Sequence, residues 1–279
     1  MIQNNRIIYS DNGTNTDISV NMNRFQSGTA TIAMVATEDY IYLGSDWKFN
    51  HRHIHVSSAN AVASVASVEL YDGSNWRAAV DVIDQTSVTG ATLAQSGIIS
   101  WVPDRSYSWN KIQSTESIAA LSGFKIYDFY WARIKVSANL TAGTAIKYIG
   151  YKFSTDEDLG SYYPEFETTA FKAGFEASKT EWNEQHITAA EIIISDLIKK
   201  QKIVSRNQIM NWEKFTIPAI HAVASIVFRA LGNDWSDKMQ KAIEDYRDSF
   251  DMIAFDVDTN QNGMLDHGEK LVDLMVTRR

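Results

Sequence analysis

The sequence predicts an α+β multidomain chain: an antiparallel β-sandwich or jelly roll over residues 1–155, then an all-α helical bundle over 165–279 that ends in an EF-hand-like loop. Three observations predict this. Side chains alternate with period two up to about residue 153, apolar residues recur with period 3.6 after Pro164, and a calcium-loop pattern occupies residues 258–269. A chain of 279 residues is long enough for two domains with cores of their own.

The first half reads as strands separated by turns. The segment "YWARIKVSA" alternates, with Tyr130, Ala132, Ile134 and Val136 on one face and Trp131, Arg133 and Lys135 on the other. The segment "VELYDGSNWRAAVDVID" predicts a hairpin that turns at residues 72–75. "DYIYLGSDW", "SGIISWVP" and "TAIKYIGYKF" predict further strands. About eight short strands with intervening turn signals are typical of a sandwich or jelly roll.

The polar stretch "STDEDLGSYYP" separates the two halves and predicts an acidic linker over residues 156–164. Its carboxylates, Asp156, Glu157 and Asp158, are interpreted as a solvated hinge.

Helical spacing follows the linker. Phe171, Phe175, Ser178 and Trp182 would share one helical face. Two capping boxes are predicted, one from Thr188 with Glu191 and one from Ser205 with Gln208.

The longest apolar helix is predicted within "IPAIHAVASIVFRALG". Its stripe comprises Ile220, Val223, Ala224, Val227, Phe228 and Leu231, and Gly232 is placed to end it. Because this helix is apolar nearly all round, it should be the centre of the bundle, and its surface should exceed what the bundle buries alone. The next helix would present Met239, Ala242, Ile243, Tyr246, Phe250 and Ile253.

Composition excludes several classes of function. The net charge of −8 argues against a surface that grips phosphates. The absence of cysteine excludes disulfides, thiolate metal sites and cysteine nucleophiles. We expect no membrane partner, because neither a signal peptide nor a run of about 18 apolar residues is visible.

The segment "DTNQNGMLDHGE" matches an EF-hand loop at every ligand position. Positions 1, 3, 5, 7, 9 and 12 are Asp258, Asn260, Asn262, Met264 (through its carbonyl), Asp266 and Glu269. Gly263 stands at the turn, and a helix is expected on each side.

Two interpretations of this loop stay open. It binds structural Ca²⁺, or it is a degenerate loop of the same shape held by its own hydrogen bonds. In both, it would pin a C-terminal helix at "EKLVDLMVTRR" against "DSFDMIAF".

Other candidate residues have simpler interpretations. His51, His53 and His55 have a metal-ligand spacing on one strand face, but no fourth ligand is evident. His221, within the apolar helix, is interpreted as a core or interface histidine. No phosphate-binding glycine loop, G-x-S-x-G elbow or H-E-x-x-H helix occurs, so we expect no enzyme activity.

Two groups of motifs resemble structural proteins of tailed-bacteriophage virions. "YDGSNWRAAVDVID", "LAQSGIISWVPDRSYSW" and "KIYDFYWARIKVSANL" are similar to a phage β-sandwich module, with its strand ending in Trp, G-x-I-x-W-x-P segment, further Trp and Y-W-x-R. "QIMNWEKFTIPAIHAVASIVFRALGNDWSDKMQKAIEDYRDSFD" with "FDVDTNQNGMLDHGE" resembles head–tail connector (adaptor) proteins, whose helices end in Y-x-x-x-(Y/F).

This resemblance implies a non-enzymatic neck protein of the virion, assembled in the host cytoplasm. It would form a homo-oligomeric ring, of twelve copies in the family, between the portal protein and the tail or neck proteins. An acidic ring suits DNA that passes nearby without specific binding.

The alternative is a carbohydrate-binding tail or baseplate module that contacts the host surface. Trp47, Trp76, Trp101, Trp109 and Trp131 could stack on sugar rings if they were exposed.

Overall fold

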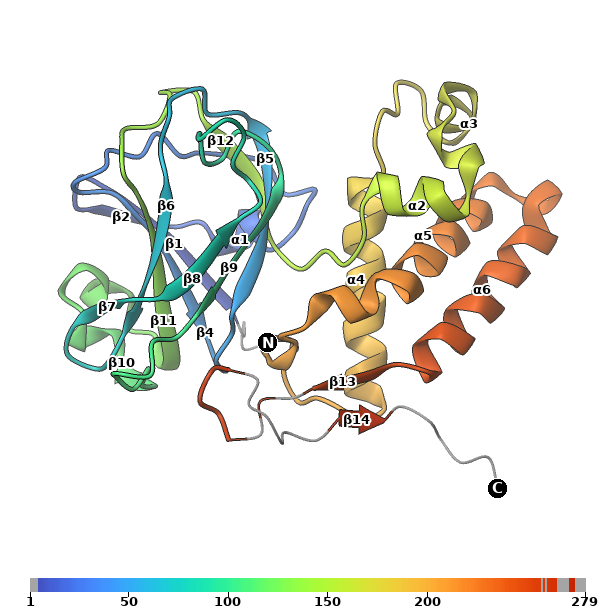
Figure 1. Ribbon diagram of the computed structural model, residues 1–279. Helices are drawn as coiled ribbons and strands as arrows, with labels where there is room; N and C mark the ends of the chain where they lie inside the picture. The colour runs from blue at the N-terminus through green and yellow to red at the C-terminus, as the bar shows by residue number, and fades with distance from the viewer. Residues whose placement is uncertain (1–4, 257, 259, 265–270, 274–279) are drawn as a thin grey trace. The chain divides into compact units, whose positions relative to one another are not determined.

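Strands fill the first part of the chain and helices most of the second, as the change in periodicity predicts (Figure 1). The computed structural model describes residues 5–256, 258, 260–264 and 271–273. These residues divide into two units. The β unit comprises residues 5–150 with 258 and 260–264, and the helical unit comprises residues 151–256 with 271–273.

The larger sheet of the β unit is antiparallel and has the strand order β2-β1-β4-β11-β6-β7, with β10 paired to β11 beside that path. Its strands are β1 (Asn5–Asp11), β2 (Thr14–Asp17), β4 (Tyr40–Ser45), β6 (Ala66–Tyr71), β7 (Trp76–Ala78), β10 (Ile112–Ser114) and β11 (Tyr127–Val136). The predicted hairpin is confirmed, since β6 pairs with β7 across the turn at residues 72–75.

The smaller sheet is also antiparallel and has the order β3-β12-β5-β9-β8. Its strands are β3 (Ala30–Thr31), β5 (His51–Ser58), β8 (Val80–Asp84), β9 (Gly97–Val102) and β12 (Ala145–Gly150). The chain changes sheet at Ala79, because β7 pairs with β6 while β8 pairs with β9. The alternating run over 76–84 therefore forms two strands in different sheets.

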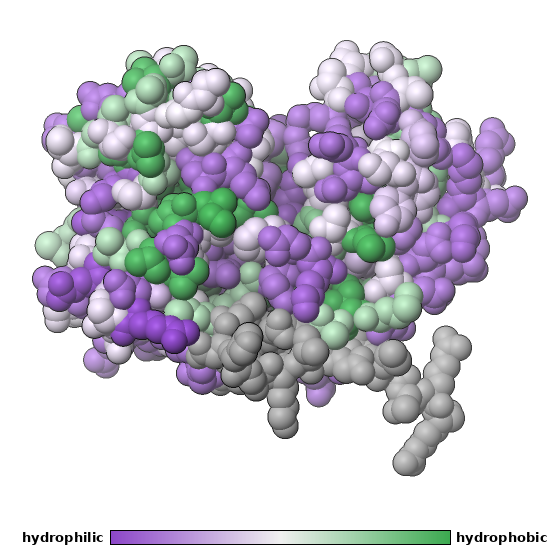
Figure 2. Space-filling view, in the orientation of Figure 1, coloured by the Kyte–Doolittle hydropathy of each residue, from purple (hydrophilic) through white to green (hydrophobic). Residues whose placement is uncertain are grey.

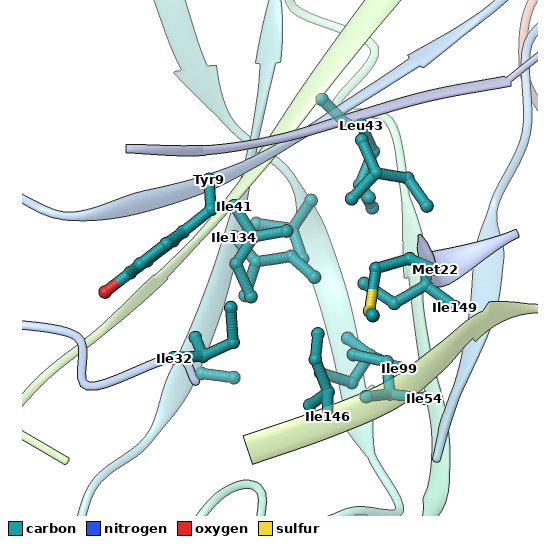
Figure 3. Packing of buried hydrophobic residues seen from close by; sticks show 14 of the residues in the cluster. Tyr9, Met22, Ile32, Ile41, Leu43, Ile54, Ile99, Ile134, Ile146 and Ile149 are labelled. Atoms are coloured by element: carbon teal, nitrogen blue, oxygen red, sulfur yellow. The ribbon is translucent and has the colours of Figure 1, made fainter. Parts of the chain in front are cut away.

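One hydrophobic cluster joins the two sheets. The larger sheet contributes Tyr9, Ile41, Leu43 and Ile134, the smaller sheet contributes Ile54, Ile99, Ile146 and Ile149, and helix α1 (Ser19–Met22) contributes Met22. Figure 3 shows these side chains pointing toward one another. The predicted common face of β11 is confirmed, since Tyr130, Ala132, Ile134 and Val136 all belong to this cluster.

The outer face of the larger sheet carries a second cluster. Trp131 and Tyr42, from β11 and β4, pack with residues of a segment that includes the 3₁₀ helices η1 (Thr115–Ser117) and η2 (Ala119–Phe124). Gly44 lies opposite Trp131 in the β4–β11 register. The indole covers this glycine so closely that a Cβ on Gly44 would lie 2.7 Å from Trp131 Cη2.

The helical unit contains five α-helices among the residues described. They are α2 (Asp156–Tyr162), α3 (Thr169–Phe175), α4 (Asn183–Lys199), α5 (Thr216–Leu231) and α6 (Ser236–Asp251). Short 3₁₀ turns connect them: η3 (Pro164–Glu167), η4 (Arg206–Gln208), η5 (Trp212–Phe215) and η6 (Asn233–Trp235).

Helix α5 is the centre of this unit, as predicted. Ile220, Val223 and Val227 are at most 1% exposed, and Gly232 follows the last helical residue. The stretch Trp212–Leu231 is the one described helix that is long and apolar enough to cross a membrane, but it packs as core. Its stripe is therefore not the exposed apolar surface that we expected, and hydrophilic residues cover most of the visible face of this unit (Figure 2).

Two local predictions in this half are wrong. Residues 156–162 form helix α2, so the segment 156–164 is not a linker. Thr188 lies inside α4 and donates to Glu184 O at 2.9 Å, so it caps nothing. The box of Ser205 with Gln208 is confirmed, although it opens only the 3₁₀ turn η4.

The C-terminal segment also differs from the expected helix–loop–helix. Strand β13 (Ala254–Asp256) follows α6, and it pairs antiparallel with β14 (Leu271–Asp273). A strand therefore occupies 271–273, where the sequence predicts a helix. Backbone hydrogen bonds join the strands before and after the loop, and the periodicity of apolar side chains does not reveal such pairing.

Replacing Gly44 by Ala is expected to destabilise the β unit. The new methyl group would overlap the Trp131 ring, which has to move within a packed cluster. Overpacking of this kind costs about 1–3 kcal/mol of unfolding free energy. Urea denaturation followed by tryptophan fluorescence measures the change.

Gly123→Ala is the matched control, because a Cβ at Gly123 meets no atom within 4 Å. It should change stability by no more than about 0.5 kcal/mol. Equal effects of the two substitutions would contradict the described Gly44–Trp131 contact.

Candidate functional site

The loop at 258–264 is organised around the carboxylate of Asp258. Its Oδ1 accepts the backbone N–H of Asn262 at 3.0 Å, and its Oδ2 accepts that of Gly263 at 2.7 Å. Asn260 Oδ1 also accepts the Asn262 N–H, at 2.9 Å, and Asn262 Oδ1 accepts the Met264 N–H at 2.8 Å. The predicted ligand side chains at positions 1, 3 and 5 thus all turn back into the loop.

Glycine at position 263 is required for two reasons. Its φ of +86° lies in the left-handed region that side chains rarely adopt. A Cβ at this position would also lie 2.9 Å from Pro103 Cγ, 3.4 Å from Lys48 Cδ and 3.5 Å from Trp109 Cε3. The described loop residues therefore pack against the β unit.

The carboxylate of Asp258 is fully buried in this arrangement, at 0% exposure. Its charge acts on two β-unit side chains. Burial lowers the pKa of Lys48, and the charge of Asp258 acts in the opposite direction. Burial raises the pKa of Tyr130, and the charge of Asp258 raises it further. The charge of Asp258 therefore acts on side chains of the β unit.

The described part of the loop has the donor chemistry of a site for a hard cation. One carboxylate and two amide oxygens suit Ca²⁺, and such oxygens accept more than one interaction each. Asp266 and Glu269, the other two predicted acidic ligands, lie outside the described residues. Within the described part of the chain, no three His, Cys, Asp or Glu residues are grouped to hold a metal. The loop's fit to Ca²⁺ therefore rests on the oxygens of Asp258, Asn260 and Asn262.

The three histidines of β5 do not assemble a metal site among the described residues. His55 Nδ1 lies 3.2 Å from Ser96 Oγ, and His51 Nδ1 lies 2.8 Å from Asn50 Oδ1. The His53 ring lies 6.5 Å from the Tyr148 ring. These contacts are those of packed side chains on a strand.

The tryptophans of the β unit serve mainly as core. Trp101, Trp109 and Trp131 are at most 2% exposed, and Trp109 Nε1 donates to Trp131 O at 3.0 Å. Trp47 and Trp76 are half-buried. Three of the five rings are therefore buried and present no face to a sugar.

Sequence reasoning missed a Ser–His–Asp arrangement in the helical unit. Ser154 Oγ lies 2.7 Å from His186 Nδ1, and His186 Nε2 lies 3.1 Å from Asp156 Oδ1. With Asp156 ionised, Nε2–H donates to the carboxylate and Nδ1 accepts the serine hydroxyl; the partners assign this tautomer. The spacing of about 30 residues along the chain offers no motif that could have revealed it.

The burial of these residues favours a structural role. His186 is 0% exposed and Ser154 3% exposed, so neither presents a reacting atom to solvent. Asp156 also accepts the Trp182 N–H at 3.2 Å, where α4 begins. Asp158 caps α2 in a reciprocal box with Thr155. Asp156, predicted to be part of a solvated hinge, thus joins the start of α2 to the start of α4, while Asp158 caps α2.

His221 of α5 has the expected core environment. Its Nδ1 lies 2.8 Å from the hydroxyl of Tyr163, and the ring of Tyr162 meets it edge-on. Burial lowers the pKa of His221 and raises that of Tyr163 to about 12. The pair links α5 to the segment between α2 and η3.

No protein-family model matches this chain, and neither curated proteins nor solved structures give a match.

The stability of the helical unit is expected to fall with acid through His186. Burial lowers its pKa below the ordinary 6.5, outweighing the hydrogen bond with Asp156 that raises it. The folded state therefore binds fewer protons than the unfolded state below pH 6.5. The stabilisation is complete above that pH and is lost as the pH falls toward the folded pKa. His186→Gln should lessen the loss of stability between about pH 7.5 and about pH 5.5.

Urea denaturation followed by circular dichroism at the helical minimum measures this difference. Ser154→Ala is the control, because it removes one hydrogen bond and keeps the titrating ring. A His186→Gln protein that weakens in acid as steeply as the wild type would contradict the assignment.

Proposed function

We propose that this protein is a non-enzymatic structural protein of a tailed-bacteriophage virion, a head–tail connector that forms a ring between the portal and the tail. The proposal starts from the resemblance of its motifs to a phage β-sandwich module and to adaptor proteins. We further propose that the two sheets of the β unit constitute a jelly-roll-like sandwich and that the loop at 258–269 binds structural Ca²⁺.

The observation that carries the proposal is the packing of the motif residues in the β unit. Trp109 meets Tyr130 with ring centroids 5.7 Å apart, and it bonds to the Trp131 carbonyl. The guanidinium of Arg133 lies 4.5 Å from the centre of the Trp76 ring. The motif tryptophans Trp76 and Trp109 therefore both contact the Y-W-x-R motif, although they are distant from it in sequence. Motifs with this role maintain an architecture, as a structural module requires.

The helical motif residues have the same character. The Y-x-x-x-F stretch of α6 consists of Tyr246 and Phe250, whose rings lie 5.6 Å apart. The hydroxyl of Tyr246 donates to Asp196 Oδ2 at 2.8 Å, joining α6 to α4. These residues set the mutual position of two helices, which is what an adaptor bundle needs to present a fixed surface to a ring.

Electrostatics supports a position beside a DNA channel. The chain carries a net charge of −8. A ring of such subunits repels the DNA backbone and lets the polymer pass without specific binding. Because the α5 stripe is buried, ring formation is inferred from the resemblance alone.

The purified protein is expected to assemble with the portal of its own virion. Alone it should be monomeric or weakly associated, and on portal rings it should add one density layer of matching symmetry. Mass photometry and negative-stain electron microscopy of the mixture measure this. A protein that stays monomeric alone and ignores portal assemblies is not a connector.

Calcium is expected to bind the loop with a dissociation constant of about 10⁻⁵ to 10⁻³ M, since the loop has no paired partner and two amides replace carboxylates. Glu269→Gln should abolish binding, because the last loop position supplies two oxygens to the ion. Titration calorimetry with CaCl₂ measures both proteins, with Glu176→Gln, at an exposed site outside the loop, as control. If neither the wild type nor Glu269→Gln releases or absorbs heat on addition of CaCl₂, the loop does not bind calcium and is only a turn.

A further inference from the structure

Three loops that meet at one end of the β unit contain no charged side chain. The loops 59–65, 85–96 and 137–144 follow β5, β8 and β11, and Figure 1 shows them at the upper end of the β unit in that view. They include no Asp, Glu, Lys, Arg or His, whereas 22% of the residues of the whole chain are charged. We call the surface of these three loops the neutral end.

The side chain of Asn60 holds the three loops together. It is 2% exposed, its Nδ2 donates to Thr92 O at 2.9 Å, and its Oδ1 accepts the Thr141 N–H at 3.0 Å. A hydrogen bond from Ser64 Oγ to Ala138 O, at 3.2 Å, adds a second link between two of the loops. Because these contacts fix the loops in advance, little conformational entropy is lost when a partner binds them.

The neutral end exposes apolar side chains. Val62, Val65 and Val88 are 42%, 65% and 40% exposed. Their exposed neighbours in the same loops are Ala, Ser, Thr, Gly, Asn or Gln residues. Depletion of charged residues is the compositional signal of the centre of a protein–protein interface. The neutral end therefore has the composition and the rigidity of a docking surface.

The charge of the chain indicates which partner fits this surface. Each copy carries a net charge of −8, so two copies repel one another when their charged surfaces face each other. A surface without charges is where two such copies can meet without opposing carboxylates. A basic partner, in contrast, would gain more from the acidic surfaces elsewhere on the chain. The occupant that suits a neutral end on an acidic protein is a second copy of the same chain.

We propose that the neutral end is the surface through which one copy of this protein contacts another. This inference deepens the proposed ring, and it rests on that proposal for the assembly in which the contact is used. It assigns the association of copies to the loops of the β unit, since the apolar stripe of α5 is buried.

A charge introduced at the neutral end should weaken self-association. Val65→Glu leaves the backbone hydrogen bonds between Val65 and Ser137 in place. It should raise the dissociation constant between copies at least about tenfold, because the contact would then bury an unpaired carboxylate. Higher salt should tighten the association of the wild type, because salt screens the net charge of the copies. Sedimentation velocity over a concentration series measures both effects.

Val20→Glu is the matched control. Val20 lies in α1 of the same unit and is 63% exposed, close to the 65% of Val65. The substitution adds the same charge outside the neutral end, so the dissociation constant should stay within about twofold of the wild-type value. Hydrogen–deuterium exchange of the wild type at low and high protein concentration gives a readout that needs no variant. The loops 59–65 and 137–144 should exchange more slowly at the high concentration.

The outcomes separate this inference from the proposed function. A wild type that stays monomeric at every concentration, or equal weakening by the two variants, overturns the role of the neutral end. If the wild type self-associates, Val65→Glu does not, and neither binds portal rings, the neutral end joins copies and the connector proposal is wrong. If the wild type and Val65→Glu add the same layer to the portal, the connector proposal stands and the role of the neutral end is wrong.

Discussion

The pairing of β4 with β11 is the constraint on which the β unit depends. These strands lie in the interior of the larger sheet, and both of their faces are buried. Ile134 faces the cluster between the sheets, while Trp131 faces the outer cluster. Because successive strand residues point to opposite sides, a shift of one position would exchange these two environments. Gly44 stabilises the register, since only a residue without a Cβ leaves room for the Trp131 indole.

The helical unit combines an apolar centre with polar contacts that set the positions of its helices. Helix α5 is buried through Ile220, Val223 and Val227. Because apolar contacts are not directional, this burial alone does not set the orientation of the helix. The hydrogen bonds of His186 with Ser154 and Asp156 are directional, and they join the start of the unit to α4. Such buried polar networks specify one arrangement when every member has a partner.

The C-terminal loop gives the proposed function its testable chemistry. Strands β13 and β14 belong to the helical unit, whereas the loop residues described between them pack on the β unit. Asp258 organises the loop by accepting two N–H groups, its charge acts against the lowering of the Lys48 pKa by burial, and it occupies the first position of a calcium-ligand pattern.

The sequence by itself determined the order of strands and helices, the two faces of β11, the central position of α5 and the cap at Ser205. Each of these depends on neighbours within one turn or on one strand, where periodicity and capping chemistry act directly. The tertiary structure alone decided the change of sheet at Ala79, the Ser154–His186–Asp156 contacts and the docking of the loop beside Lys48. These join residues about 20 to more than 200 positions apart, and their partners are selected by packing and by burial of charge. The strand at 271–273 has the same origin, because its hydrogen bonds go to β13 and not to its own neighbours.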